Sequence, residues 1–194
     1  MIPFAAVLLA GGQSRRMGRD KALLSLPDGR LLWQRQLGVL QKLEPAELFI
    51  SGPAREGFPA DVPLLADATP GLGPLSGIAA ALGAMRSPLL VVLAVDMPTM
   101  TAGYLQGLLD RCRDGRGIVP QHSDTGFYEP LAAVYPRSVQ GLATARLAEQ
   151  NRVLQSFVRA AGSLVNPWAI TTEDRALFAN WNESQGPDGT PSRP

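Results

Sequence analysis

The residues with the clearest chemical potential stand together near the start of the chain, between Leu9 and Lys21. An apolar run ends in two adjacent glycines, Gly11 and Gly12, and a segment dense in cations follows. Because glycine lacks a Cβ, its backbone can approach a ligand closely, and successive N–H groups of such a loop can bind an anion. The neighbouring guanidinium and ammonium groups can engage phosphate oxygens. This segment predicts a site for a nucleoside triphosphate.

The spacing of these glycines differs from that of two common phosphate loops. A P-loop requires G-x-x-x-x-G-K-[ST], whereas Gly12 and Gly18 are too far apart and Arg19 follows them. The dinucleotide-binding fingerprint G-x-G-x-x-G is broken because Gly11 and Gly12 are adjacent. The phosphates are therefore expected to be bound by another kind of loop.

Asp96 is the second candidate, at the end of the most continuous apolar run of the chain, residues 89–95. A carboxylate beside a buried strand is unfavourable unless it meets a cation or hydrogen-bond donors. Next to a triphosphate the expected cation is Mg²⁺, a hard ion held by one or two carboxylates together with phosphate oxygens. The alternative is an aspartate that only satisfies the turn after the strand. We predict that Asp96 holds the metal.

Three further residues have less specific surroundings. Lys21 follows the glycine loop at a distance that allows its ammonium to offset charge on the α-phosphate. Asp67 is expected either to contact the ribose or base of a nucleotide or to be an ordinary loop aspartate. His122, the single histidine, lies in a polar segment and is expected to be a solvated surface residue rather than a catalytic base.

Apolar strand-like runs and periodic helix-like segments alternate through about residue 120, which predicts an α/β fold. The expected architecture is three-layered: a mostly parallel, Rossmann-like sheet with helices on both faces. Ligands of such sheets bind beyond the carboxyl ends of the strands. The opening loop, the loop around Gly73 and Asp96 all follow predicted strands, so they are expected at one edge. The expected strands are 4–10, 48–50, 62–65, 89–95 and 117–120, and the expected helices are 31–43, 78–85 and 102–112.

Beyond residue 120 the pattern predicts a strand over residues 128–135 and a helix that begins at Pro136. A shorter helix over 153–161, an edge strand at 164–165 and a final turn capped by Thr172 are expected to follow. Residues 1–183 are predicted to form a single domain. Residues 184–194 are rich in glycine, proline and serine and are predicted to be a disordered tail.

Composition bounds the class of protein. The chain has 194 residues, of which 45% are hydrophobic and 18% charged, which is typical of a soluble globular domain. A formal net charge of +1 favours neither nucleic acid nor a membrane as partner. Cys112, the single cysteine, cannot form an internal disulfide. This cysteine usage fits the predicted cytoplasmic location. Because no basic segment precedes the first apolar run, a signal peptide is not expected.

The stretch from Leu9 to Lys21 resembles L-A-G-G-x-S-x-R-M-G-x-D-K, the signature of nucleotidyltransferases that join a nucleoside monophosphate to a phosphorylated acceptor. Every fixed position is present. Further segments resemble molybdenum cofactor guanylyltransferases, in order over about residues 5–182. These segments are Gly73-Pro74-Leu75-Ser76-Gly77-Ile78, Glu129-Pro130-Leu131 with Tyr135, Asn151-Arg152 before an apolar helix, and Phe178-x-Asn180-x-Asn182.

The resemblance implies an enzyme that transfers GMP from GTP to molybdopterin carrying molybdenum, with release of pyrophosphate and with Mg²⁺ as cofactor. Arg16, the fixed arginine of the signature, would contact the leaving pyrophosphate. Arg152, Asn180 and Asn182 would bind the acceptor. Proteins that deliver molybdopterin or receive the finished cofactor are implied as possible partners. The implied nucleotide-binding residues are Leu9, Ala10, Gly11, Gly12, Lys21, Asp67, Gly73, Gly77 and Asp96.

Two segments depart from the family pattern, and two related activities stay open. Ser51-Gly52-Pro53 stands where members often have an asparagine near the base, and Glu183-Ser184-Gln185 replaces the usual Thr-Pro and acidic residue. The alternatives are a transferase that uses CTP on the same pterin and one that uses an NTP on a sugar phosphate. The proline-leucine form of the second loop favours guanine. A nucleotide-binding regulator without catalysis would be expected to lack Lys21 or Asp96.

Overall fold

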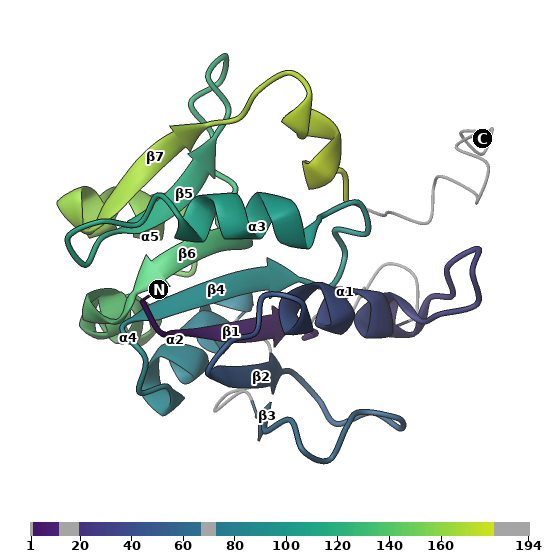
Figure 1. Ribbon diagram of the computed structural model, residues 1–194. Helices are drawn as coiled ribbons and strands as arrows, with labels where there is room; N and C mark the ends of the chain where they lie inside the picture. The colour runs from purple at the N-terminus through teal and green to yellow at the C-terminus, as the bar shows by residue number, and fades with distance from the viewer. Residues whose placement is uncertain (1, 12–19, 67–72, 181–194) are drawn as a thin grey trace.

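A seven-stranded sheet forms the centre of the computed structural model, which describes residues 2–11, 20–66 and 73–180 (Figure 1). The strand order is β3-β2-β1-β4-β6-β5-β7. β6 is antiparallel to β4 and β5, and the other neighbours pair in parallel, so the predicted mostly parallel sheet is confirmed. The strands are β1 (Phe4–Leu9), β2 (Glu47–Ser51), β3 (Leu64–Leu65), β4 (Leu89–Ala94), β5 (Gly117–Gln121), β6 (Ala132–Pro136) and β7 (Val165–Ala169).

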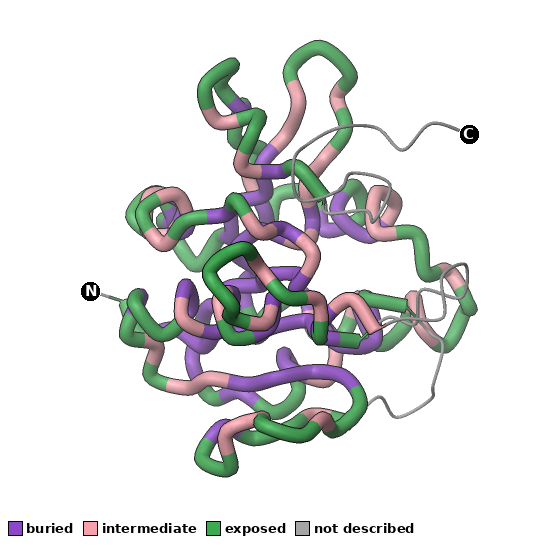
Figure 2. Tube along the Cα trace, turned by 90° about the vertical axis from the view of Figure 1, so that its right-hand side faces the viewer, coloured by how far each residue is buried: buried purple, intermediate pink, exposed green. Residues whose placement is uncertain are grey.

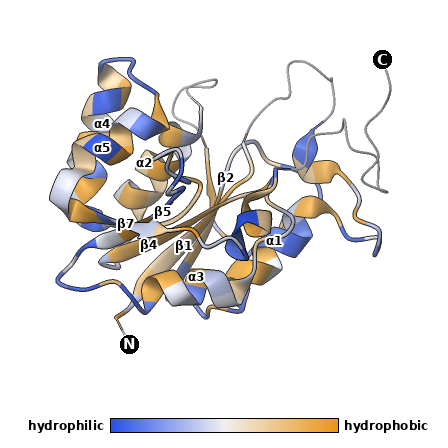
Figure 3. Ribbon diagram, turned by 90° about the horizontal axis from the view of Figure 1, so that it is seen from above, coloured by the Kyte–Doolittle hydropathy of each residue, from blue (hydrophilic) through white to orange (hydrophobic). Residues whose placement is uncertain are grey.

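Helices cover both faces of this sheet, as predicted. Figure 3 shows α1 and α3 on one face and α2, α4 and α5 on the other. No helix among the described residues is both long enough and apolar enough to cross a membrane. The α-helices are α1 (Leu32–Gln41), α2 (Pro74–Ala84), α3 (Ala102–Leu109), α4 (Gln140–Ala148) and α5 (Leu154–Ala161), and the short 3-10 helices are η1 (Lys21–Leu23), η2 (Arg137–Val139), η3 (Gly162–Leu164) and η4 (Asp174–Phe178).

β1 shows how one apolar strand supports two cores. All six of its residues are buried. Because side chains alternate along a strand, Phe4, Ala6 and Leu8 join the core beneath α1 and α3. The intervening residues of β1 join the core beneath α2, α4 and α5. The buried stretches run through the middle of the molecule in Figure 2. A strand that is apolar on both sides is typical of a sheet covered on both faces.

α2 packs against the sheet more closely than a β-carbon would permit at Gly77. A Cβ built on this residue would lie 2.5 Å from Oγ of Ser51 and 2.8 Å from Cδ2 of Leu9. Both side chains stand at the carboxyl ends of their strands. The glycine therefore sets how closely the start of α2 approaches the end of the sheet where the predicted ligand site lies.

We expect Gly77→Ala to lower the free energy of unfolding by about 1–3 kcal/mol, because the added methyl group overpacks this contact. Gly83→Ala is the matched control in the same helix, since a Cβ there would meet its nearest neighbour, Nε2 of Gln140, at an ordinary 3.5 Å. The control should be neutral or stabilising, because alanine favours helix more than glycine does. Denaturant unfolding measures the stability of both variants. If Gly77→Ala were as stable as Gly83→Ala, the close approach at Gly77 would be contradicted.

Several predicted boundaries of strands and helices in the C-terminal half are wrong. β6 begins at Ala132 rather than at residue 128, after Pro130, which has no N–H to donate to a ladder. Pro136 ends that strand, and α4 begins only at Gln140, after η2. Thr172 does not cap the final turn: Glu173 stands at the N-cap of η4 without a side-chain cap bond, and the N–H of Asp174 donates to Oγ1 of Thr171 at 3.1 Å. The predicted tail, residues 184–194, lies outside the described residues.

Candidate active site

The carboxyl ends of β1, β2 and β4 meet at one edge of the sheet, which we name the carboxyl edge. It lies at the right of Figure 1 and faces the viewer in Figure 2. Gly11 follows β1 there and Asp96 follows β4, so the structure places both predicted ligand-binding positions at this edge. Parallel pairing of β1 with β4 produces this placement, since parallel neighbours end on the same side.

Lys21 and Asp96 form an ion pair at the carboxyl edge. Nζ of Lys21 lies 3.1 Å from Oδ2 of Asp96, although 75 positions separate the two residues in the sequence. The side chains are 28% and 25% exposed, so the pair is partly shielded from water and still accessible to a ligand. A cation and a carboxylate in direct contact beside a glycine loop can together act on a bound phosphate and its metal ion.

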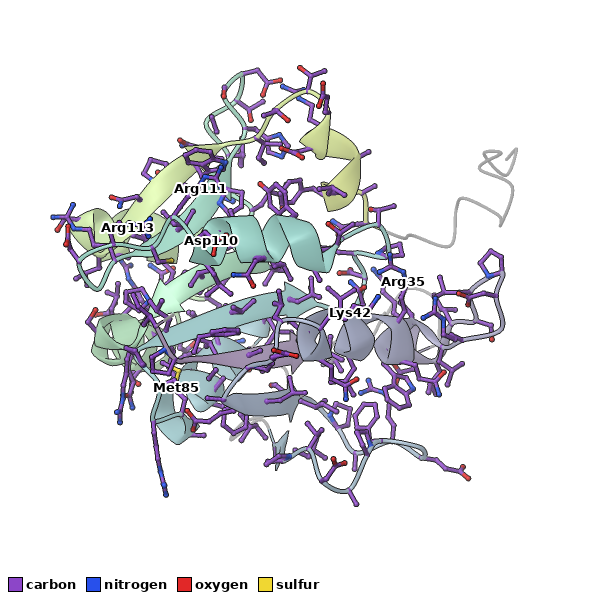
Figure 4. All side chains as sticks on the ribbon, viewed as in Figure 1. Arg35, Lys42, Met85, Asp110, Arg111 and Arg113 are labelled. Atoms are coloured by element: carbon purple, nitrogen blue, oxygen red, sulfur yellow. The ribbon has the colours of Figure 1, made fainter. Side chains whose placement is uncertain are left out.

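A buried side chain from α1 fixes the turn that carries Asp96. Gln36 is fully buried, and its Nε2 donates to the carbonyl of Met97 at 2.6 Å and to that of Ala94 at 3.4 Å. Its Oε1 accepts a 2.8 Å hydrogen bond from Arg35, labelled in Figure 4. These bonds hold the backbone on both sides of Asp96. Gln36 was not predicted from the sequence, although a glutamine on the apolar face of a helix is a recognisable signal.

A second buried polar side chain, that of Arg55, positions Lys21 indirectly through Asp20. Asp20 caps η1, because its Oδ1 accepts a 3.1 Å hydrogen bond from the N–H of Ala22. Arg55 grips the same carboxylate with two bonds, Nε to Oδ2 at 2.5 Å and Nη2 to Oδ1 at 2.9 Å. The Arg55 side chain is only 6% exposed, and its guanidinium lies 5.6 Å from the ring centroid of Phe58. Arg55 therefore orients, through Asp20, the 3-10 helix that begins with Lys21.

We expect Arg55→Met to lower kcat/KM for the nucleotide about 10- to 100-fold, since small displacements of a charged group strongly reduce its effect on a reacting phosphate. Methionine preserves the apolar stem but loses the bidentate contact. Arg30→Met is the matched control, because Arg30 makes a similar two-bond contact with Asp28 on an exposed surface. Steady-state kinetics with thermal melting of both variants measures the effect. If Arg55→Met retained as much activity as the control, the positioning role would be refuted.

The end of β2 packs directly against the start of the glycine loop. Gly52 has φ +139°, and a Cβ there would lie only 2.6 Å from the backbone nitrogen of Gly11. The N–H of Ala10 donates to the carbonyl of Ser51 at 2.8 Å. The Ser51 side chain is buried and faces α2 at Gly77. In place of the asparagine of the family pattern, this segment therefore offers close backbone contact at a position that requires glycine.

The described part of the second glycine segment begins at Gly73, directly before α2. Gly73 is the N-cap of α2 with φ +75° and ψ −174°, a conformation that glycine adopts at low cost. Its carbonyl accepts hydrogen bonds from the N–H of Ser76 at 3.2 Å and from Oγ of Ser76 at 2.7 Å. The proline at the first helical position, Pro74, is favoured there because its missing N–H needs no partner.

The remaining predicted residues differ in burial, and some of them lie outside the described residues. Leu9 and Ala10 are buried at the end of β1, where they support the loop. Arg152 and Asn180 are exposed, the first between α4 and α5 and the second just after η4. Four predicted positions lie outside the described residues: Gly12, Arg16, Asp67 and Asn182.

His122 differs from the solvated surface residue that was expected. Nε2 of His122 lies 2.8 Å from Oε1 of Glu129, and the two side chains are 22% and 23% exposed. The aromatic ring of Phe178 lies against the imidazole, with ring centroids 6.2 Å apart. This pairing was not predicted from the sequence; a hairpin between residues 121 and 128 brings the two residues together.

Asp96 suits a magnesium ion, which prefers hard oxygen ligands. Among the described residues no group of three or more His, Cys, Asp or Glu side chains could hold a metal ion. A single carboxylate fits Mg²⁺ better than zinc, because magnesium commonly takes one or two carboxylates and completes its shell with water and substrate phosphates. The donor set of the described residues is thus compatible with an ion held jointly by protein and triphosphate.

Comparison with known proteins identifies the class of protein that has this fold and this site. Residues 6–168 match the model of the MobA-like NTP transferase domain. The chain belongs to this family and is a nucleotidyltransferase. It is 41% identical over 191 residues to a probable molybdenum cofactor guanylyltransferase of Opitutus terrae, which covers 95% of this chain and 93% of that protein. A protein of the same description in Mycobacterium tuberculosis is 34% identical over 193 residues, covering 95% and 92%.

Solved structures share the fold. Molybdopterin-guanine dinucleotide biosynthesis protein A of Archaeoglobus fulgidus superposes with a TM-score of 0.69 at 23% identity, over 92% of each chain. The 2-C-methyl-D-erythritol 4-phosphate cytidylyltransferase of Thermus thermophilus superposes with a TM-score of 0.65 at 16% identity, over 91% of each chain. The expected α/β nucleotidyltransferase fold is confirmed.

Proposed function

We propose that this chain transfers GMP from GTP to molybdopterin, which carries molybdenum, and releases pyrophosphate to form a guanine dinucleotide cofactor. The observation that carries the proposal is the Lys21–Asp96 ion pair beside the glycine loop at the carboxyl edge. The relatives named probable molybdenum cofactor guanylyltransferase, at 41% and 34% identity, support the choice of nucleotide and acceptor. The proline-leucine form of the loop at Gly73 supports guanine over cytosine.

The bond changes of the proposed reaction need little covalent help from the protein. An oxygen of the acceptor phosphate attacks the α-phosphorus of GTP and forms a new P–O bond. The bond from the α-phosphorus to the oxygen that bridges to the β-phosphate breaks, and pyrophosphate leaves with that electron pair. A phosphate monoester is largely ionised near pH 7, so its oxygen attacks without a strong general base. Positioning and electrostatic stabilisation then supply most of the catalysis.

The chain's own residues supply both the positioning and the electrostatic stabilisation. Gly11 lies where the loop backbone can approach the phosphates, and the ammonium of Lys21 offsets the charge that grows on the α-phosphate. Arg16, proposed from the sequence signature, takes the leaving pyrophosphate, and Asp67 contacts the nucleoside. Asp96 would hold Mg²⁺, which when bound neutralises phosphate charge. Gln36 and Arg55 keep the carboxylate and the ammonium in place.

The acceptor is proposed to lie on the other side of Asp96, toward β6, β5 and η4. Arg152 offers a cation to an acidic substrate, and Asn180 and Asn182 offer amide groups. A cytoplasmic location, and partner proteins that deliver molybdopterin or receive the dinucleotide, belong to the same proposal.

Pyrophosphate release with each of the four NTPs, with and without molybdopterin, tests the proposal. We expect release with GTP only when the pterin is present. Release with CTP and the pterin would show that CTP, and not GTP, is the nucleotide substrate. Turnover of a sugar phosphate without any response to the pterin would overturn the proposed acceptor. Heat-denatured enzyme controls for spontaneous hydrolysis.

A further inference from the structure

The His122–Glu129 pair lies at the same edge as Asp96. β4 and β6 are antiparallel, with Leu93 opposite Ala132, and the N–H of Ala94 donates to the carbonyl of Leu131 at 2.8 Å. The end of β4 and the beginning of β6 therefore coincide. Beyond this pair the chain turns away from β4, because the N–H of Ala132 donates to the carbonyl of Glu129 at 3.4 Å. β5 runs parallel to β4, because both are antiparallel to β6, so His122 after the carboxyl end of β5 and Glu129 paired with it lie at this edge, on the side of β4 away from β1.

The hairpin that carries the pair is firmly held. The N–H of His122 donates to the carbonyl of Phe127 at 2.8 Å, and the N–H of Glu129 donates to the carbonyl of Pro120 at 2.8 Å. These bonds fix the backbone at both members of the pair. A ligand that binds to the two side chains would therefore meet a preformed site and not a segment that must first become ordered.

The two elements proposed to bind the acceptor are tied to this hairpin. Gln155, near the start of α5 and three residues after Arg152, exchanges two hydrogen bonds with the backbone of Tyr128, at 3.0 and 2.8 Å. Phe178 of η4 contacts His122 two residues before Asn180. These contacts place the start of α5, three residues after Arg152, and the end of η4, two residues before Asn180, beside the hairpin.

The chemistry of the pair predicts what it binds. An ionised carboxylate is a hydrogen-bond acceptor at both oxygens, and among the side chains that the structure describes, His122 alone bonds to Glu129, at Oε1. Among the described residues no lysine or arginine forms a salt bridge with Glu129. A partly buried carboxylate without such a cation favours a ligand that donates hydrogen bonds. Adjacent ring N–H and amino groups, as in a 2-amino-4-oxopyrimidine, match a carboxylate in this way.

We propose that Glu129, oriented by His122, binds the amino-pyrimidinone edge of the acceptor's pterin ring. This inference rests on the proposed function. The guanine of GTP carries the same edge, but β1 and β3, which precede the glycine loop and Asp67 in the sequence, lie on the opposite side of β4 from β6 and β5. The pair therefore determines acceptor specificity and leaves nucleotide binding to the other half of the edge.

Glu129→Gln tests the assignment, because glutamine preserves size and presents an amide in place of the second carboxylate oxygen. Molybdopterin binding is followed by pterin fluorescence, and GTP binding by calorimetry without acceptor. We expect acceptor affinity to fall about 10- to 100-fold, as for loss of a hydrogen bond to a charged group, and GTP affinity to change less than about twofold. Glu149→Gln, at an exposed helix end, is the control and should change neither.

His122→Gln should weaken acceptor binding by a smaller factor, because Glu129 keeps its charge but loses its orienting partner. If Glu129→Gln melts at the assay temperature, Glu129→Asp replaces it, and its retracted carboxylate should also weaken the acceptor selectively. Unchanged acceptor affinity in a folded variant, or an equal loss of GTP affinity, would overturn the inference while the proposed function stands. A wild-type chain that does not bind molybdopterin would overturn both.

Discussion

Asp96→Asn is expected to lower kcat about 10²- to 10³-fold, because the variant keeps the shape of the side chain and loses the charge that holds the metal ion. The fold should persist. Gln36 bonds to backbone carbonyls around the turn and not to the Asp96 carboxylate, so the turn keeps its support in the variant. The loss should therefore be specific to magnesium-dependent turnover.

A magnesium titration of the rate measures this effect, together with thermal melting. Asp61→Asn, an exposed aspartate in the loop before β3, is the control and should leave both the rate and its magnesium midpoint unchanged. An unaltered rate, or the same magnesium midpoint as in the wild-type chain, would show that Asp96 does not hold the metal.

Lys21→Met is expected to lower kcat by a similar factor, about 10²- to 10³-fold, because the ammonium acts on charge that develops only as the new bond forms. KM for GTP should change less, since other groups bind the ground-state triphosphate. Lys21→Arg should recover only part of the rate, because a planar guanidinium does not place its charge where a compact ammonium does.

Single-turnover kinetics separates the chemical step from binding in these variants. Lys42→Met, at the far end of α1 and labelled in Figure 4, is the matched control. A loss confined to KM, with an unchanged rate at saturation, would contradict a role for Lys21 in the transition state. In the Lys21/Asp96 double variant the losses should be less than additive, because the two side chains are in contact and act as a unit.

The layers of the fold could be predicted from local patterns. β1 and β4 are short apolar runs that end at Gly11 and Asp96, and such runs indicate strands buried on both faces. The cap at Thr101 was also predictable, since a threonine before a helical pattern favours capping, and its Oγ1 accepts the N–H of Tyr104 at 3.2 Å. These patterns do not determine the direction of each strand. The antiparallel direction of β6 depends on a long connection and on packing.

The supports of the site could not be predicted in the same way. Gln36 reaches carbonyls 58 and 61 positions away, and Arg55 reaches Asp20 across 35 positions. No local periodicity encodes such contacts, because they arise only when separate elements meet at the carboxyl edge. The environment of the lone His122 was not predicted either, because it depends on the hairpin that brings Glu129 to it and on Phe178 of a distant turn.

A crystal structure with Mg²⁺ and a non-hydrolysable GTP analogue is the most direct test of whether Lys21 and Asp96 act on one bound nucleotide. We expect the α-phosphate about 3 Å from Nζ of Lys21, a charge-assisted hydrogen bond, and the metal ion coordinated by Asp96 and phosphate oxygens. A triphosphate bound elsewhere, or metal coordination without Asp96, would contradict the proposed site.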